Sequence, residues 1–183
     1  MSFFENTRKP AGFGGKLMVV MMNLSHSPVA RWGLRFLELA PDDKVLDCGC
    51  GTGILSIVSA KLGAQEVTAY DIDEWSVENT RHNSSLNGIN NIDIKHGDAS
   101  LLSTIDKKFD IVLANINRNI LLIDMAAFRN VMADGGILLL SGFYLQDSDL
   151  LINHAKELNL SLTKQTTKNG WCMLRFETIG KIQ

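Results

Sequence analysis

The feature that most constrains the fold is a turn with glycine at every second position, in the run VLDCGCGTG at 45–53. A strand-like apolar run leads into this turn, and a stretch with helical spacing follows it. Gly49, Gly51 and Gly53 can adopt positive φ values, and they leave no Cβ between the backbone and a ligand. Free N–H groups at the start of the next helix favour a carboxylate or another anion. The run therefore predicts a strand–turn–helix unit that holds a ligand, with a tight turn without a ligand as the alternative.

Short apolar runs alternate with amphipathic stretches from residue 44 onward, which is typical of βαβ units around a mainly parallel sheet. The expected strands are 44–48, 66–71, 92–96, 109–114 and 136–141. The expected helices are 54–62, 74–87, 119–132 and 147–158. Two more strands, 160–167 and 171–177, flank an Asn-Gly step that predicts a hairpin. The predicted fold class is α/β: a Rossmann-like, doubly wound, mostly parallel sheet of seven strands with an antiparallel C-terminal hairpin.

The size and composition indicate one ordinary folded domain. The chain has 183 residues, which is enough for a single substantial core, and its 45% hydrophobic and 21% charged residues argue against disorder and against a fibrous architecture. We therefore expect a single domain over 1–183. Within it, a helix is expected over 31–39, with Pro41 marking its end.

The net charge bears on which partners the protein binds, and the cysteines bear on its cellular compartment. The formal net charge of -2 gives no general attraction to phosphate backbones, so a nucleic-acid partner is not indicated. Cys48 and Cys50 share a turn too short for an ordinary disulfide, and with Cys172 they make an odd number, so we expect free thiols and a cytoplasmic protein. The apolar runs are too short to cross a membrane, and no secretory signal is evident. No further metal ligands lie at suitable spacing from Cys48 and Cys50, so we expect no metal.

The order of the elements and the glycine turn resemble class I S-adenosylmethionine-dependent methyltransferases, whose first motif is an acidic residue followed by G-x-G-x-G. The dinucleotide pattern G-x-G-x-x-G has a different spacing, which disfavours the alternative of a nicotinamide oxidoreductase. The resemblance implies S-adenosylmethionine as cofactor and S-adenosylhomocysteine as product. It implies donor contacts at Asp47, Gly49, Cys50, Gly51 and Gly53.

Acidic residues follow the next two strands. Asp71 ends the second strand, where a carboxylate can accept hydrogen bonds from both ribose hydroxyls of a nucleoside, and Ile72 beside it is assigned to the same site. Asp73 is interpreted as a helix N-cap. The resemblance implies that Asp98 contacts the adenine amino group while Ala99 leaves room for the ring; a solvated turn aspartate is the alternative for Asp98.

Two residues are candidates for catalysis. Asn115 follows the fourth strand, where it could contact the donor and align a nucleophile, while Asn117 or Asn119 could cap the next helix. The prolines and aromatic of an N/D-P-P-Y/F motif are missing there, which counts against methylation of adenine N6 or glutamine. The segments 12–15 and 22–26 look like the N-terminal segment that covers the methionine end of the donor in related enzymes. His26 in the second segment could be a general base, or a structural histidine.

Residues 45–177 are most similar to bacterial lysine methyltransferases that modify the eleventh protein of the large ribosomal subunit. The segments that carry this resemblance are GILSI at 53–57, DIDEW at 71–75, ANI at 114–116, LSGF at 140–143 and NGW at 169–171. It implies protein methylation, with a ribosomal protein as a candidate methyl acceptor. Residues 1–40 instead resemble other small class I methyltransferases, without that family's recognition domain and G-T-G-T-H segment.

This difference leaves several interpretations open. The chain could be a natural relative or an assembled mosaic, a donor-binding protein without efficient turnover, or a small-molecule methyltransferase. We expect it to bind the donor without efficiently methylating the ribosomal protein, because alignment of the acceptor depends on binding energy remote from the reacting atoms.

Overall fold

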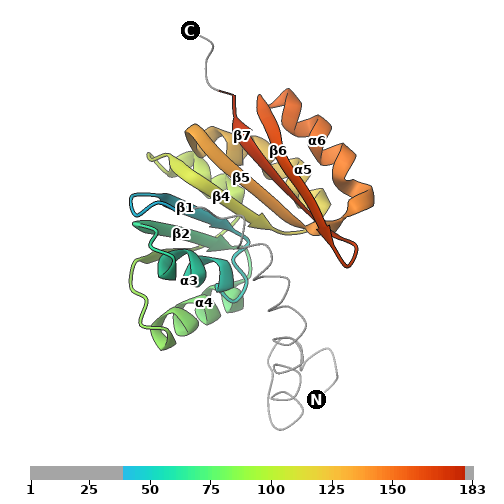
Figure 1. Ribbon diagram of the computed structural model, residues 1–183. Helices are drawn as coiled ribbons and strands as arrows, with labels where there is room; N and C mark the ends of the chain where they lie inside the picture. Colours follow the sequence, from blue (N-terminus) through green and yellow to red (C-terminus); the bar gives the residue numbers. More distant parts are fainter. Residues whose placement is uncertain (1–38, 180–183) are drawn as a thin grey trace, which may run out of the picture. The chain divides into compact units, whose positions relative to one another are not determined.

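The computed structural model describes residues 39–179, in which seven strands form one sheet accompanied by four α-helices (Figure 1). The strands are β1 Lys44–Cys48, β2 Glu66–Asp71, β3 Ile92–His96, β4 Phe109–Asn115, β5 Met132–Tyr144, β6 Leu160–Lys168 and β7 Trp171–Thr178. The helices are α3 Ile54–Lys61, α4 Glu74–Leu86, α5 Arg118–Val131 and α6 Ser148–Glu157, with 3-10 turns η1 Ala99–Thr104 and η2 Leu145–Asp147. The helix expected over 31–39 lies almost entirely outside the described residues, and a single domain over 1–183 stays a prediction.

The strands lie in the order β3-β2-β1-β4-β5-β7-β6, so the chain adds strands first on one side of β1 and then on the other. β1 pairs in parallel with β2 on one side and with β4 on the other, so the chain builds outward to β3 and then returns to the other side of β1. Ligands of open α/β sheets bind beyond the carboxyl ends of the strands at such a reversal. The carboxyl ends of β1 and β4 therefore mark the place for a site.

The C-terminal hairpin reverses the chain so that β7 runs antiparallel between β5 and β6. Asn169 and Gly170 in its turn have φ values of 53° and 83°. Two consecutive positive φ values are what a type I′ turn requires, and such a turn matches the twist of the strands it joins. The predicted fold class, with its seven strands and antiparallel hairpin, is confirmed.

Alternate side chains of β1 face opposite sides of the sheet. Leu46 and Cys48 belong to a buried cluster that includes Leu121 of α5 and Leu151 of α6. Asp47 points the other way, toward α3, and is only 1% exposed. Asp47, two residues before Gly49, is therefore a buried carboxyl group beneath the glycine turn.

β5 is longer than the expected strand 136–141, and α5 is correspondingly shorter at its end. Met132 already pairs with Phe109 of β4, although the register shifts between Phe109 and Ile111 and Gly135 has a φ of 75°. Met132 also fits the apolar spacing of α5. Hydrophobic periodicity alone therefore could not show where the chain leaves the helix.

Candidate functional site

The glycine turn folds back on the carboxyl end of β2. The N–H groups of Gly49 and Cys50 both donate to the carbonyl of Tyr70, at 2.9 and 3.0 Å, and Gly53 donates to the carbonyl of Cys50 at 2.8 Å. Gly53 occupies the N-cap position of α3 and has no side chain of its own to cap the helix. The start of α3 therefore lies next to the turn, where backbone N–H groups not bonded to Asp47 can face an anionic or polar ligand.

Two of the three glycines are needed for packing. A Cβ at Gly49 would lie 2.5 Å from Cγ2 of Ile116, and one at Gly53 would lie 2.6 Å from Cγ2 of Thr80. Gly51 differs, because a Cβ there would meet no atom of residues 39–179 within 4 Å. Gly51 therefore presents its backbone to open space between two tightly packed neighbours.

Asp71 holds the Gly51 end of the turn. Its Oδ2 accepts a hydrogen bond from the N–H of Gly51 at 2.8 Å, and its Oδ1 accepts one from the N–H of Asp73 at 3.0 Å. Each carboxylate oxygen can accept a second bond, and the residue is partly exposed. Asp71 therefore both shapes the turn and keeps acceptor capacity toward solvent.

Asp47 anchors the start of α3 from below. Its Oδ2 accepts hydrogen bonds from the backbone N–H of Ser56 at 3.0 Å and from the Ser56 hydroxyl at 2.5 Å. Burial raises the pKa of Asp47 to about 6; the bonds from Ser56 oppose this rise and the charge of Asp71 adds to it. Its side chain lies beneath the turn, where it supports the backbone of α3.

The predicted contact residues Cys50 and Ile72 differ in accessibility. Cys50 is 6% exposed with its Sγ 3.5 Å from Oγ1 of Thr80, and burial raises the pKa of this thiol to about 12. Ile72 is 71% exposed directly after Asp71, and its carbonyl lies 3.0 Å from Nε2 of His96. Ile72 therefore offers an uncovered apolar side chain at this edge of the sheet, while Cys50 contributes to the packing of the turn.

The segment after β3 carries the second acidic position. Asp98 is exposed at the start of η1, where its Oδ1 accepts a bond from the N–H of Ser100 at 2.9 Å, while Ala99 is 7% exposed. The hydrogen bonds from Ser100 lower the pKa of Asp98. Asp124 on α5 has its pKa raised by burial and by the charge of Asp98. Asp98 thus caps a turn and still faces solvent, so both interpretations drawn from the sequence fit its position.

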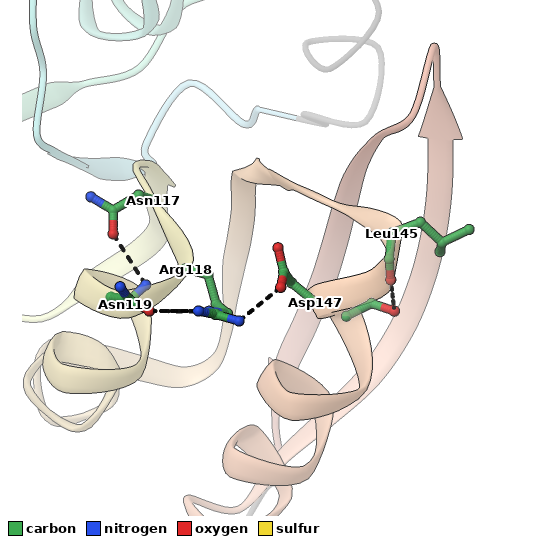
Figure 2. A network of polar contacts seen from close by, with 6 residues as sticks. Asn117, Arg118, Asn119, Leu145 and Asp147 are labelled. Atoms are coloured by element: carbon green, nitrogen blue, oxygen red, sulfur yellow. Dashed lines mark hydrogen bonds and ion pairs between the residues drawn. The ribbon is translucent and has the colours of Figure 1, made fainter.

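Asn115 ends β4 as an exposed residue paired with Ser141 of β5. Its Oδ1 lies close to Gly142, where an added Cβ would be 2.8 Å away. Asn117 is the N-cap of α5 and accepts bonds from the N–H groups of Asn119 and Ile120, which confirms one of the two helix-cap alternatives (Figure 2). Asp73 likewise caps α4, as predicted, by accepting a bond from the N–H of Ser76.

Several residues that shape the site carry no local sequence signal. Thr80 of α4 donates to the carbonyl of Gly51 at 2.9 Å, and Asn83 donates to the carbonyl of Thr52 at 2.9 Å. Gly142 and Ile116 pack the other wall of the turn. All lie far along the chain from the glycine run. His26, the candidate base, lies outside the described residues, as do the segments 12–15 and 22–26.

All three cysteines are free, as predicted, and all three are buried. Among residues 39–179, no group of three or more His, Cys, Asp or Glu side chains is arranged to hold a metal ion. In the same part of the chain, no helix has the length and apolar character needed to span a bilayer.

Comparison with known sequences identifies the same relationship as the motifs. The profile of the ribosomal protein L11 methyltransferase (PrmA) family matches residues 28–178. A ribosomal protein L11 methyltransferase of Porphyromonas gingivalis is 53% identical over 133 residues, which cover 73% of this chain and 46% of that protein. The corresponding protein of Phocaeicola vulgatus is 45% identical over 72% of this chain and 47% of its own length. The chain thus spans about half the length of the curated relatives it matches.

Solved structures agree with this assignment. The ribosomal protein L11 methylase of Lactobacillus delbrueckii subsp. bulgaricus superimposes with a TM-score of 0.76 at 28% identity, covering 85% of this chain and 79% of that one. Magnesium protoporphyrin IX methyltransferase of Synechocystis with bound SAM, at 20% identity and a TM-score of 0.66, shares the fold over 96% of this chain and 91% of its own. The predicted resemblance to methyltransferases is confirmed: the chain belongs to the ribosomal protein L11 methyltransferase family.

Proposed function

We propose that this chain is an S-adenosylmethionine-dependent methyltransferase that binds its donor at the carboxyl ends of β1, β2 and β3. The observation that carries the proposal is the open space at Gly51, whose N–H is held by Asp71. A nucleoside there would have its ribose hydroxyls near Asp71, its adenine against Ile72, and its amino group toward Asp98. Ala99, which is small and buried, leaves room for the ring.

The donor supplies an electrophilic methyl group: the acceptor nitrogen bonds to the methyl carbon as the C–S bond breaks, its electron pair goes to sulfur, and S-adenosylhomocysteine forms. Asn115 is the proposed catalytic residue, because its amide at the end of β4 can orient an incoming amine. The amine proton passes to water or to a base, and His26 is the candidate that the sequence predicts for that base. Water exclusion and alignment account for the rest of the rate.

We propose a protein amine as the acceptor, with ribosomal protein L11 as the first candidate because the relatives are named for it, and we expect its methylation by this chain to be slow. A small molecule is the second candidate acceptor. Free, buried thiols suit a reducing compartment, and we propose that the protein works in the cytoplasm.

The donor assignment is tested by calorimetric titration of the purified chain with S-adenosylmethionine, S-adenosylhomocysteine and NAD. Either of the first two should bind more tightly than NAD. Tighter binding of NAD would overturn the proposal, and donor binding without methyl transfer to the two candidate acceptors would leave a donor-binding protein.

Gly51→Ala should raise the donor Kd at least about 10-fold while the protein still folds. The new methyl group meets no atom of the described part of the chain, and it enters the space assigned to the donor. Its positive φ, +56°, adds a folding cost of about 1–2 kcal/mol. Gly88→Ala is the matched control, because Gly88 has a φ of +68°, equally open surroundings and a place before β3, at the opposite edge of the sheet. Equal donor affinity in the two folded variants would place the donor elsewhere.

Asp71→Ala should weaken donor binding by about 1.5–3 kcal/mol, or roughly 10- to 150-fold in Kd, through loss of charge-assisted bonds to the ribose hydroxyls. Asp71→Asn should fall between this variant and wild type, because it can still hold the N–H of Gly51. The control is Asp73→Ser, which removes the neighbouring carboxylate but keeps a capping oxygen. Calorimetry checks all three variants, and an unchanged Kd in folded Asp71→Ala would exclude Asp71 from the ribose site.

A further inference from the structure

An ion pair joins the two loops that follow β4 and β5. Nη1 of Arg118 lies 2.9 Å from Oδ1 of Asp147, and Nε and Nη2 of Arg118 also donate to Oδ1 of Asn119, at 3.1 and 2.9 Å (Figure 2). The Asp147 side chain is only 17% exposed and that of Arg118 is 37% exposed. The guanidinium is therefore fixed on both sides between α5 and η2.

Neither side chain makes the interaction that its position in its own helix would favour. Arg118 is the first residue of α5, at the positive end of the helix dipole, where a cation is unfavourable. Asp147 is at the N-cap position of α6 yet makes no capping bond with its side chain. Both charges are used for the contact between the loops rather than for the helices that carry them.

The contact lies beside the proposed catalytic residue. The loop after β4 begins at Asn115, and a Cβ added at Gly142 of β5 would be 2.7 Å from the carbonyl oxygen of Ile116 and 2.8 Å from Oδ1 of Asn115. The two chain segments therefore touch at Asn115. A change in the distance between their loops would move the Asn115 amide.

The second loop is also fixed on its far side. The N–H of Leu145 donates to the carbonyl of Gly170 at 3.2 Å, and the rings of Tyr144 and Trp171 stack with centroids 4.6 Å apart. These contacts with the hairpin turn fix the position of the loop after β5. The ion pair between Arg118 and Asp147 then fixes the loop after β4 relative to it.

We propose that Arg118 and Asp147 are positioning residues for methyl transfer, because their ion pair fixes the Asn115 amide at the acceptor side of the donor site. This inference rests on the proposed function. In-line transfer depends steeply on the position of the reacting groups, whereas an ion pair with this exposure adds little to global stability. A positioning role therefore predicts a loss of kcat with little change in donor affinity or in unfolding.

The test compares Arg118→Gln, Asp147→Asn and the double variant, with Lys107→Gln as a control that breaks the ion pair with Glu66. Radiolabelled S-adenosylmethionine and ribosomal protein L11 serve as substrates. Each single variant should lower kcat about 10-fold, the double variant should be no worse than either single, and donor Kd should stay within 2-fold. The exchanged pair, Arg118→Asp with Asp147→Arg, should restore part of the lost kcat.

Amide hydrogen exchange on the same proteins provides a readout that does not need turnover. The amides of 115–118 and 142–145 should exchange about 10-fold faster in Arg118→Gln, while those of β1 and β2 are unchanged. Wild-type kcat or wild-type exchange in folded Arg118→Gln would overturn the inference. If wild type binds the donor but methylates neither candidate acceptor, the proposed function fails, and the exchange data alone decide whether the ion pair positions Asn115.

Discussion

Gly53→Ala should lower the free energy of unfolding by about 2–5 kcal/mol, which is a large effect for one methyl group. Gly53 has a φ of +81°, where alanine costs about 1–2 kcal/mol. The added Cβ would also lie 2.6 Å from Cγ2 of Thr80, and such overpacking typically costs about 1–3 kcal/mol. Urea unfolding measures the sum, and donor binding should be lost with the displaced turn.

The two contributions can be separated with a second substitution. Thr80→Ser removes the Cγ2 that the new methyl group meets but keeps the hydroxyl that donates to Gly51. Gly53→Ala measured in the Thr80→Ser background should recover about 1–2 kcal/mol relative to the same change in wild type. Gly88 has a positive φ but no close neighbour among the described residues, so Gly88→Ala measures the cost of positive φ alone. No recovery in the Thr80→Ser background would show that Cγ2 of Thr80 is not what limits position 53, where the added Cβ would also lie 3.1 Å from Cβ and from Oγ1 of Thr80.

Asp47 should make the protein less stable as the pH rises from about 4 to 7, relative to the variant Asp47→Asn. Burial raises the pKa of Asp47 from 3.8 to about 6, so the folded state binds a proton that the unfolded state has already released within this interval. Its stabilising contribution is complete below pH 3.8 and is lost as the pH passes through about 6. The difference amounts to about 3 kcal/mol.

Asp47→Asn is the right reference because its amide oxygen can still accept both bonds from Ser56. The two proteins also share every other titrating group, so the difference between their unfolding curves isolates Asp47. Chemical unfolding at half-unit steps from pH 4 to 7.5 gives that difference. A difference independent of pH would mean that Asp47 titrates normally despite its burial.

The sequence could place those candidate site residues that lie next to the ends of predicted strands. The glycine turn follows β1, Asp71 ends β2 and Asp98 comes two residues after β3, so strand prediction places them at one edge of a parallel sheet. The Asn-Gly step likewise identifies its hairpin, because the turn conformation is set by those two residues.

The side-chain contacts that could not be predicted join residues that are distant in the chain. Thr80 meets the glycine turn from another helix, and nothing near residue 80 indicates that contact. The Arg118–Asp147 pair joins residues 29 positions apart, and both look misplaced when their own helices are considered alone. Asp47 matches the acidic position of the family motif, but only the fold shows that its side chain lies beneath the turn; a direct donor contact by Asp47 stays a prediction.

The strand order also has a consequence for behaviour at high concentration. Within residues 39–179, β3 and β6 are the two outer strands of the sheet, and an outer strand presents backbone groups that another chain could pair with. β3 carries Asp93 and Lys95, while β6 carries Lys164 and Lys168. Charged side chains on an outer strand oppose edge-to-edge association, because pairing would bring them together and strip their water. The hydrophobic strands β1, β4 and β5 lie between these charged outer strands, whose charges oppose growth of the sheet by edge-to-edge pairing.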